Sequence, residues 1–451
     1  MKKIKINTER IENEEKFKKG LSIIKKIISK GKTAFFVGGC VRDFLTGIIP
    51  KDYDIATDAF PDEIENIFSN TKPVGKQFGV ILVIIDKIPF EVATFRTDKD
   101  YKDGRRPKKV IFTTPEEDAL RRDFTINGMF LDPIKKEIID YVNGLEDINK
   151  KIIRAIGDPY KRFEEDKLRM LRAIRFASVL DFKIEDKTWK AIIEKHSEIS
   201  VVSSERIRDE LIKLLTSKNA YNGLKLLYES KLLKTILPEV EKLSVVKQPP
   251  QFHPTENALE HTMLLFKFLE NPSPTLAMAA LLHDIGKAET MTITDRIRFH
   301  NHHNVGAKIA ENILKRLKFP NNEIELITRY IRNHMKFIDV KKMKQSTLKK
   351  FLAQDNFEEE LEMHKADCLA SHKNLENYEY CKNILNTLKK DQLKPDPILR
   401  GKDLIEMGYK PGKIFSTILE YAYNKQLEEP KITKNKLKSL VRKKFPIKEA
   451  E

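Results

Sequence analysis

Two aspartates follow a pair of glycines near the start of this 451-residue chain. Gly38 and Gly39 end an apolar run, and Asp52 and Asp54 stand one residue apart shortly afterwards. Adjacent glycines at a strand-to-helix turn let backbone amides approach an anion, and the helix N-terminus adds a partial positive charge. Residues i and i+2 of a strand point to the same side, so both carboxylates could hold one or two Mg²⁺ ions. The two motifs together predict a magnesium-dependent site for a phosphate-bearing ligand, with Arg42 in the first helical turn pairing with a phosphate.

A second set of metal-binding residue types occurs between residues 257 and 375. It contains four histidines and two aspartates, and one histidine is followed directly by an aspartate in the segment LLHDIGK. Such ligands suit Mg²⁺, Mn²⁺, Ni²⁺ or iron, and an ion of this kind activates water for attack on a phosphate ester. The alternative is a helical scaffold that keeps these residues without a metal. The six residues are His261, His283, Asp284, His302, His334 and Asp367.

The elements that must position the aspartates are short strands. Runs rich in Val, Ile and Phe, separated by Gly, Pro and Asp clusters, follow a predicted helix over Glu14–Lys30 that ends at Gly31. From about Asp158 the apolar spacing becomes helical, and it predicts helices over Phe163–Leu180 and Ser204–Ser217. The fold class predicted is therefore α+β, with a small mixed-sheet head followed by helical domains. The predicted strands are Thr33–Val37, Val80–Ile85, Phe90–Phe95 and Val110–Phe112.

The composition restricts the partners and the location of the chain. It has 84 Lys and Arg against 67 Asp and Glu, a formal net charge of +17, which favours a polyanionic partner such as nucleic acid. A hydrophobic fraction of 40% is too high for a disordered chain, and no apolar run approaches the roughly 20 residues of a membrane span. Three cysteines without paired spacing, and a basic start without an apolar signal segment, predict a cytoplasmic location.

The motifs GGCVRD and DYD, in this order, resemble the signature of the polymerase-β-type nucleotidyltransferases. Within that group they resemble the bacterial class II tRNA CCA-adding enzymes and the related poly(A) polymerases. The resemblance is dense over residues 33–215 and looser beyond. Further along, Pro89–Phe112 resembles the family's strand and flexible loop, and Arg121–Asp132 resembles its ribose- and triphosphate-binding motif. Arg162–Ala177 resembles its nucleobase-selecting helix, and Ser203–Leu211 resembles its neck motif.

This resemblance implies that the 3′-hydroxyl of an RNA attacks the α-phosphorus of CTP or ATP and releases pyrophosphate. It implies Asp52 and Asp54 as the ligands of Mg²⁺, with Glu91 as a third catalytic carboxylate, for which a surface glutamate on an edge strand is an equal alternative. The loop Thr97–Lys109 resembles the one that helps such enzymes change from adding C to adding A. The implied nucleotide-binding residues are Gly38, Gly39, Arg42, Arg121, Arg122, Asp123, Asn127, Asp166, Arg169, Arg172 and Arg175.

Two residues of the resembling helix permit a physical argument about base choice. Asp166 and Arg169 are three apart and hence expected on one helix face. A carboxylate accepts from an exocyclic amino group, and a guanidinium donates to a ring nitrogen or carbonyl. Cytosine and adenine present an amino group beside such an acceptor, whereas uracil and guanine present a carbonyl there. One Asp–Arg pair could therefore accept C and A and reject U and G; an i,i+3 salt bridge on a solvated helix is the alternative.

The histidine-rich block resembles the HD superfamily of metal-dependent phosphohydrolases. His302 and His334 lie where members with two metals carry extra ligands, whereas His303 stands where an acid is common, which leaves the second metal open. The expected domains are a nucleotidyltransferase head over residues 1–150, an all-α neck for nucleobase selection and RNA binding over 151–247, an HD domain over 248–375, after the proline-rich break Gln248–Pro254, and a basic helical RNA-binding tail over 376–451.

Together these patterns predict a Mg²⁺-dependent CCA tRNA nucleotidyltransferase whose partners are the tRNA 3′ end, CTP and ATP, without a membrane and with an undetermined oligomeric state. An A-adding enzyme or a poly(A) polymerase shares nearly every motif and stays open. A phosphohydrolase whose main activity lies in the HD domain, which would hold Mg²⁺ or a divalent transition metal, is a further alternative. An RNA-binding protein without activity is disfavoured, because Asp52 and Asp54 would repel RNA unless a metal bridged them.

Overall fold

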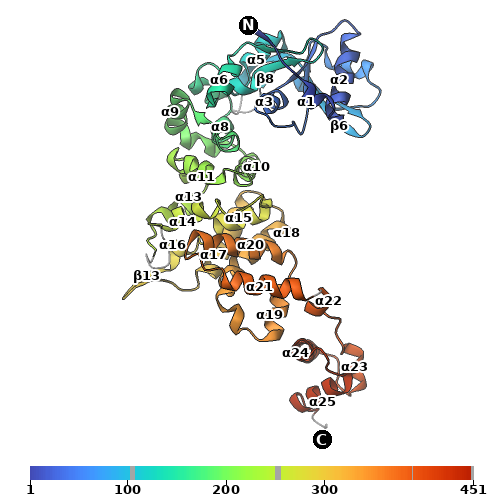
Figure 1. Cartoon of the computed structure of the whole chain (residues 1–451), viewed down its shortest axis with the longest axis vertical. Helices are drawn as coiled ribbons and strands as arrows, with labels where there is room; N and C mark the ends of the chain where they lie inside the picture. Colours follow the sequence, from blue (N-terminus) through green and yellow to red (C-terminus); the bar gives the residue numbers. More distant parts are fainter. Residues whose placement is uncertain (102–106, 249–254, 389, 448–451) are drawn as a thin grey trace. The chain divides into compact units, whose positions relative to one another are not determined.

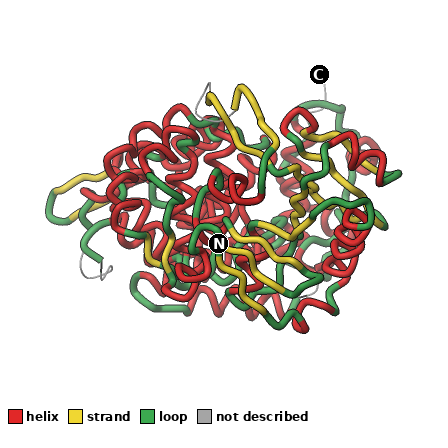
Figure 2. Tube along the Cα trace, turned by 90° about the horizontal axis from the view of Figure 1, so that it is seen from above, coloured by secondary structure: helices red, strands yellow, loops and turns green. Residues whose placement is uncertain are grey.

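The structure, a computed structural model, describes residues 1–101, 107–248, 255–388 and 390–447. The chain divides into two units, Met1–Glu241 and Lys242–Glu451. Residues 102–106 of the loop expected to assist A addition, and residues 249–254 of the proline-rich break, lie outside the described residues. Helices prevail over strands along the chain (Figure 2). The finer division into four domains stays a prediction.

The first unit is built on an eight-stranded mixed sheet (Figure 1). Neighbouring strands run antiparallel except β3 and β6, which are parallel. The sheet and the helical remainder confirm the predicted α+β fold class. In spatial order the strands are β1 (Lys2–Lys5), β10 (Glu137–Asp140), β9 (Met129–Asp132), β2 (Ala34–Val37), β3 (Asp54–Thr57), β6 (Ile88–Thr94), β5 (Val80–Ile85) and β4 (Thr71–Gly75).

The apolar runs predicted as strands are strands. The runs over residues 33–37, 80–85 and 90–95 coincide within two residues with β2, β5 and β6. The run over 110–112 is the end of β8 (Pro107–Phe112), which forms a separate antiparallel hairpin with β7 (Arg96–Tyr101). Every residue of β2 and β9 is buried, because strands in the middle of the sheet are covered on both faces. These buried central strands are a rigid support for the candidate site.

Helix α2 (Glu15–Ile28) confirms the helix predicted over Glu14–Lys30 and packs on the sheet. Its Gly20 faces Phe36 of β2, and a Cβ at this position would lie 2.7 Å from the ring atom Cε1 of Phe36. Only glycine permits this close approach of helix to sheet. The packing buries Phe17 and Ile24 of α2 against the same core.

The helix predicted over Phe163–Leu180 is wrong as one helix, because it is interrupted at Asp166. That residue has an extended backbone (φ −148°, ψ 104°), and its side chain accepts a hydrogen bond from the Leu168 amide at 3.1 Å. Aspartate competes with the helical ladder in this way and favours helix ends. The described helical elements of this unit are α1 (Glu9–Glu12), α3 (Gly39–Leu45), α4 (Pro61–Ile67), α5 (Pro115–Leu120), α6 (Gly144–Lys150), α7 (Pro159–Glu165), α8 (Leu168–Leu180), α9 (Asp186–Lys195), α10 (Ser204–Leu215), α11 (Ala220–Glu229), α12 (Leu232–Ile236) and α13 (Pro238–Glu241).

Within its described residues, the second unit is helical apart from one short hairpin, β13 (Met291–Ile293) and β14 (Ile297–Phe299). Helix α15 (Pro274–Leu282) is buried along nearly its whole length and forms the centre of this unit. Among the described residues, no helix of the chain is both long and apolar enough to cross a bilayer. The other helices of the unit are α14 (Ala258–Leu265), α16 (Lys287–Thr290), α17 (His302–Arg316), α18 (Asn321–Asn333), α19 (Gln345–Leu352), α20 (Phe357–Ala370), α21 (Glu376–Thr387), α22 (Lys390–Leu393), α23 (Gly401–Glu406), α24 (Ile414–Glu428) and α25 (Lys434–Lys444), with the 3₁₀ segment η5 (His334–Lys342).

The end of the chain has a hydrophobic core of its own. Leu404 of α23, Ile418 of α24 and Val441 of α25 are fully buried in one cluster with Leu437 and Tyr409. The last turn of α25 carries Arg442, Lys443 and Lys444. The predicted tail is therefore a folded helical element, and its binding to RNA stays a prediction.

Candidate nucleotide and metal sites

A cavity of about 450 Å³ in the first unit gathers most of the predicted nucleotide-binding residues. Six arginines and three aspartates line it, so it favours an anionic ligand. Ten of the predicted nucleotide-binding residues are present; Arg175, Asp52 and Glu91 are not among the lining residues. The lining consists of Gly38, Gly39, Arg42, Asp54, Arg121, Arg122, Asp123, Asn127, Asp166, Arg169, Arg172, Phe176 and Arg206.

The glycine pair forms the expected turn from β2 into α3. Gly38 has φ of +71°, a conformation that favours glycine, and a Cβ at this position would lie 3.1 Å from Nη1 of Arg122. Arg42 in the first part of α3 donates from Nη1 to Oδ1 of Asn127 at 2.7 Å and from Nη2 to Oδ1 of Asp43 at 2.6 Å. The turn thus places backbone and guanidinium donors at one wall of the cavity.

The three predicted carboxylates lie in different surroundings. Asp54 is the first residue of β3, whereas Asp52 precedes the strand, so the expectation that both lie on the strand is wrong for Asp52. The Asp52 side chain is 85% exposed, and its Oδ1 lies 3.0 Å from Nζ of Lys16. Among the described residues, Asp52, Asp54 and Glu91 do not bring three ligand atoms within 4.8 Å of one another. Glu91 is exposed on β6, beside the strand that Asp54 begins.

Asp54 has the electrostatics of a cation ligand. Burial raises the pKa of its carboxyl from 3.8 to about 6, and the nearby charges of Glu91 and Asp52 add to this rise, whereas Arg122 opposes it. The protein alone therefore supplies too little positive charge to stabilise the ionised form of Asp54. A divalent cation would supply that charge, so Asp54 fits the role of a Mg²⁺ ligand.

Two arginines of the cavity are held by an aspartate that sequence reasoning missed. Asp118, in the first turn of α5, is 1% exposed. Its Oδ1 accepts from Arg121 at 2.6 Å, and its Oδ2 accepts from Arg122 at 2.9 Å. Although burial raises the pKa of Asp118, the two guanidinium groups lower it overall, so the carboxylate stays ionised. Asp118 thereby fixes both arginines at the cavity.

A chain of ion pairs connects the head with α8 and α10. Oδ2 of Asp123 accepts from Arg172 at 2.7 Å, and Arg172 also lies 3.5 Å from Oε1 of Glu210. Nε of Arg175 donates to the other Glu210 oxygen at 2.5 Å, so Arg175 supports the wall rather than lining the cavity. Burial raises the pKa of Asp123, but Arg172 and the other donors lower it well below its ordinary value. Glu210 is 3% exposed and was not predicted, although it stands in the quoted neck segment.

Asp166 and Arg169 both line the cavity, yet not from one helix face as expected, because Asp166 lies in the break between α7 and α8. Asp166 receives two hydrogen bonds from Arg206 of α10, at 3.1 and 2.7 Å. Arg169 donates to Oε2 of Glu165 at 2.8 Å and to the backbone oxygen of Arg121 at 3.2 Å. Because of this break, Asp166 is held by Arg206, whereas Arg169 is held by Glu165 and the backbone of Arg121. Arg206, which sequence reasoning also missed, stands in the quoted neck segment.

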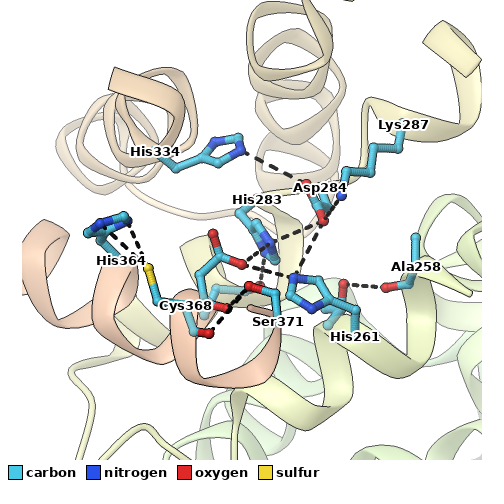
Figure 3. A network of polar contacts seen from close by, with 12 residues as sticks. Ala258, His261, His283, Asp284, Lys287, His334, His364, Cys368 and Ser371 are labelled. Atoms are coloured by element: carbon cyan, nitrogen blue, oxygen red, sulfur yellow. Dashed lines mark hydrogen bonds and ion pairs between the residues drawn. The ribbon is translucent and has the colours of Figure 1, made fainter. Parts of the chain in front are cut away.

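The six predicted ligands of the second unit are brought together, five of them buried and Asp367 partly exposed. Figure 3 shows His261, His283, Asp284 and His334 among them. They form two sets of three, and in each set the ligand atoms lie within 4.8 Å of one another. One set is His261, His283 and Asp367, and the other is Asp284, His302 and His334. All six side chains come from α14, the end of α15, α17, the start of η5 and α20.

Asp284 lies between the two sets. Its Oδ2 is 3.3 Å from Nε2 of His283, and its Oδ1 is 3.5 Å from Nε2 of His302. In the first set, Nε2 of His261 is 2.9 Å from Oδ1 of Asp367. Each carboxylate oxygen of Asp284 thus faces imidazole nitrogens of a different set, which is the geometry of a bridging ligand.

The donor atoms of both sets suit divalent cations. Nδ1 of His283 lies 2.9 Å from the backbone oxygen of Ala280, and Nδ1 of His302 lies 2.9 Å from that of Phe299, so each Nε2 is directed into the cluster. Burial, together with the neighbouring histidines, lowers the pKa of His334 to about 3, so this imidazole is neutral. Nζ of Lys287 lies 2.6 Å from Oδ2 of Asp284. Lys287 was not predicted, although it is the last residue of the quoted LLHDIGK segment. Neutral imidazoles and carboxylates are ligands for Mg²⁺ and transition metals.

Three family models match successive parts of the chain. Residues 34–154 match a poly(A) polymerase head domain, residues 181–243 match a segment described as a probable RNA- and SrmB-binding site of polymerase A, and residues 256–371 match an HD domain. Together they include the histidine cluster and the cavity residues up to Asn127 as well as Arg206, whereas Asp166, Arg169, Arg172 and Phe176 lie between the first two matched segments.

Curated relatives and solved structures give the same result. The chain is 48% identical over 209 residues to a CCA-adding enzyme of Enterococcus faecalis, covering 46% of this chain and 51% of that protein. It is 40% identical over 274 residues to one of Bacillus subtilis, covering 60% of this chain and 65% of that protein. The chain therefore spans about half to two thirds of the length of these curated relatives.

Among solved structures, a Bacillus stearothermophilus CCA-adding enzyme in complex with CTP matches with a TM-score of 0.75 and 26% identity, covering 96% of this chain and 98% of that one. A Thermotoga maritima CCA-adding enzyme complexed with tRNA matches with a TM-score of 0.64 at 19% identity, covering 98% of this chain and 100% of that one; this likeness concerns the fold alone. Both the sheet of the first unit and the helical remainder are thus shared with enzymes of this kind.

Proposed function

We propose that the chain is a tRNA nucleotidyltransferase of the class II CCA-adding enzyme family, because successive segments match a poly(A) polymerase head, a probable RNA-binding segment and an HD domain. It adds or repairs the 3′-terminal CCA of tRNA from CTP and ATP, uses no nucleic-acid template and releases pyrophosphate. The observation that carries this proposal is the cavity that unites Asp54, the glycine turn, six arginines and the pair Asp166 and Arg169.

The arginines of the cavity account for binding of the triphosphate. Arg42, at the glycine turn, and Arg121 and Arg122, held by Asp118, present guanidinium donors that match phosphate oxygens. The RNA 3′-hydroxyl attacks the α-phosphorus, and the bond to the leaving pyrophosphate breaks. Mg²⁺ bound by Asp54 and Asp52 would stabilise the charge that develops in this step. Most of the catalytic effect then comes from positioning and electrostatics.

Protonation of Asp54 should compete with Mg²⁺. The pKa of Asp54 is about 6, above its ordinary 3.8, so the carboxyl gains its proton as the pH falls through 6. Between pH 7 and pH 5 the ionised fraction falls about tenfold, and we expect the Mg²⁺ concentration for half-maximal incorporation to rise by about that factor. A Mg²⁺ titration of CTP incorporation at both pH values measures this. An unchanged half-maximal concentration would show that Asp54 does not bind the ion.

Base selection is assigned to Asp166 and Arg169, with Arg206 positioning Asp166. The carboxylate of Asp166 accepts the amino group of cytosine or adenine, and Arg169 donates to the adjacent ring nitrogen or carbonyl. Since Arg206 holds both oxygens of Asp166, the direction of the free lone pairs depends on it. The same cavity can therefore accept C and then A without a nucleic-acid template.

Replacing Arg206 by Gln should weaken discrimination more than it weakens binding. We expect the ratio of CTP to UTP incorporation to fall about tenfold, because a misplaced carboxylate loses a directional contact of roughly 1–2 kcal/mol. Separate incorporation rates for CTP and UTP measure this ratio. Arg208→Gln on the same helix is the control, since Arg208 pairs with the neighbouring Asp209 and does not line the cavity. An unchanged ratio in Arg206→Gln would remove Arg206 from base selection.

The decisive test of the proposed function offers labelled CTP, ATP, UTP and GTP one at a time to three RNAs. These are tRNA lacking CCA, tRNA lacking only the terminal A, and an unrelated RNA. We expect C on the first, A on the second and little addition to the third. Addition of A but never of C would identify an A-adding enzyme instead, and long A tails on the unrelated RNA would identify a poly(A) polymerase.

We also propose a phosphohydrolase activity for the second unit, supported by the two sets of buried ligands around Asp284. The three residues of each set hold the donor atoms close enough for one ion, and Asp284 faces both. Divalent cations bound there would act as Lewis acids on a phosphate ester. Lys287 holds Asp284 in place through its 2.6 Å contact.

A further inference from the structure

A cavity of about 430 Å³ adjoins the buried ligand sets of the second unit. Asp284, His302, His334 and Asp367 form part of its wall. The rest of the wall combines cationic and apolar side chains with further polar ones, among them three histidines, and the volume falls in the range of small-molecule sites. The cationic residues are Lys287, Arg296 and Arg298, and the apolar ones are Ile297, Phe299, Met335 and Ile338.

The hairpin β13–β14 supplies both kinds of side chain. It is inserted in the chain between the ligands Asp284 and His302, directly after α16. Its end is tied to the ligand sets, because Nδ1 of His302 lies 2.9 Å from the backbone oxygen of Phe299 and Nζ of Lys287 lies 5.2 Å from the centre of the Phe299 ring. Whatever binds the ligand sets therefore meets the hairpin.

The cations of this cavity have different tasks. Lys287 is buried against Asp284 and belongs to the ligand cluster. Arg298 pairs with Asp295 at 2.9 Å. Asp295 is exposed and Arg298 is partly exposed, so a phosphate can replace the carboxylate at little cost. Arg296 is exposed at the same wall. Among the described residues of the lining, the acids are Asp284 and Asp367, which both belong to the ligand sets. The two arginines thus form an anion site separate from the ligands.

We propose that Arg296 and Arg298 bind a second phosphate of the substrate, so that the hydrolytic site prefers a phosphate ester whose sugar carries another phosphate. This inference rests on the phosphohydrolase activity proposed above. The ester phosphate lies at the ligand sets, the nucleoside lies along Phe299 and Ile338, and the second phosphate meets the two guanidinium groups. Arginine pairs with phosphate through two parallel hydrogen bonds, and apolar and aromatic side chains accept a nucleobase face.

The reaction is a hydrolysis and needs no further reactant. The oxygen of water bonds to the ester phosphorus, the bond from phosphorus to the sugar oxygen breaks, and that oxygen takes up a proton. The second phosphate does not react and serves only for recognition. Both a free nucleoside bisphosphate and the terminal nucleotide of an RNA offer this chemistry, since the latter carries a backbone phosphate at its 5′ side.

The test compares adenosine 3′-monophosphate with adenosine 3′,5′-bisphosphate, using protein loaded with Mn²⁺. We expect kcat/KM to be at least about tenfold higher for the bisphosphate, a difference of about 1.4 kcal/mol. In the double variant Arg296→Gln/Arg298→Gln the ratio of the two kcat/KM values should approach one. Lys308→Gln is the control, since Lys308 is exposed on α17 and does not line the cavity.

A second measurement does not depend on turnover. Calorimetric titration of the metal-free protein with adenosine 3′,5′-bisphosphate should give a Kd about tenfold higher for the double variant than for the wild type and for Lys308→Gln. Equal kcat/KM for the two substrates in the wild type would overturn this inference, whereas no hydrolysis of either would overturn the phosphohydrolase activity itself. A 3′-phosphorylated diadenosine dinucleotide distinguishes the two sources of the second phosphate, an RNA end and a free nucleotide. Hydrolysis as fast as that of the bisphosphate indicates that the substrate is an RNA end, and slow hydrolysis indicates that it is a free nucleotide.

Discussion

Replacing Asp54 by Asn should lower nucleotide incorporation by roughly 1000-fold, about 4 kcal/mol of transition-state stabilisation. Asparagine keeps the shape of the side chain but removes the charge that holds a divalent cation. Incorporation of labelled CTP into tRNA lacking CCA measures the loss, while hydrolysis of a phosphate ester by the second unit should be unchanged. Asp62→Asn is the matched control, because Asp62 lies on α4 of the same unit, is exposed and pairs with Lys76 outside the cavity.

The same variant should unfold at a higher temperature than the wild type when no metal is present. The folded protein raises the pKa of Asp54 from 3.8 to about 6, so the folded state binds the proton more tightly than the unfolded state does. Ionised Asp54 therefore costs about 3 kcal/mol of stability at neutral pH, and this cost disappears as the pH falls below 4. Asparagine removes the cost. Higher stability together with lost incorporation would exclude misfolding as the cause, whereas full incorporation would refute the catalytic role of Asp54.

Replacing Asp284 by Asn should remove both metal equivalents from the second unit and reduce phosphate-ester hydrolysis at least 100-fold. Asp284 is the residue whose two oxygens face the two ligand sets, so its loss affects both. Metal content per chain, measured by mass spectrometry after dialysis, reports this directly. CTP incorporation should be unchanged, since the nucleotide cavity lies in the first unit.

A second variant separates metal binding from stability. Asp284→Asn leaves the buried Lys287 without its carboxylate, which costs roughly 3 kcal/mol and lowers the unfolding temperature. His302→Gln keeps the contact between Asp284 and Lys287 and removes a ligand from one set, so it should lose one metal equivalent and keep the other. Asp339→Asn, an exposed residue of η5 paired with Lys342, is the control. Two equivalents retained in both ligand variants would contradict the assignment.

Most of the residues that line the nucleotide cavity, though not Phe176 and Arg206, were predictable from the sequence because their motifs are local. The glycine turn, Arg42 and the Arg121–Asn127 segment each specify their own backbone shape, so strings of a few residues identify them. The strands were predictable for the same reason, since Val80–Ile85 reads as an apolar run bounded by turns. Sequence patterns thus sufficed to predict those features that depend only on the local backbone conformation.

Residues that act through distant partners were not predictable in this way. Arg206 and Glu210 acquire their roles only when α10 meets other elements, and nothing in their neighbours along the chain specifies those contacts. Asp118 differs, because its partners Arg121 and Arg122 lie three and four residues further along the chain, a local spacing that could have identified it. The break at Asp166 was missed because apolar spacing continues through it, whereas the side-chain bond to Leu168 ends the helix. Asp52 was misplaced because the i,i+2 argument assumes that both aspartates lie on a strand, whereas β3 begins only at Asp54, two residues after Asp52.

The ion pairs from Asp123 through Arg172 to Glu210 limit how this protein can be taken apart. A fragment ending near residue 150 would keep the glycine turn and Asp54 but lose the wall made by Asp166, Arg169 and Arg206. If Asp166 and Arg169 select the base as proposed, we expect such a fragment to lose this selection, and its Asp123 would have lost its guanidinium partner Arg172. Any chimera that exchanges this polymerising module with a homologue must therefore carry the segment up to Glu210 in the same graft.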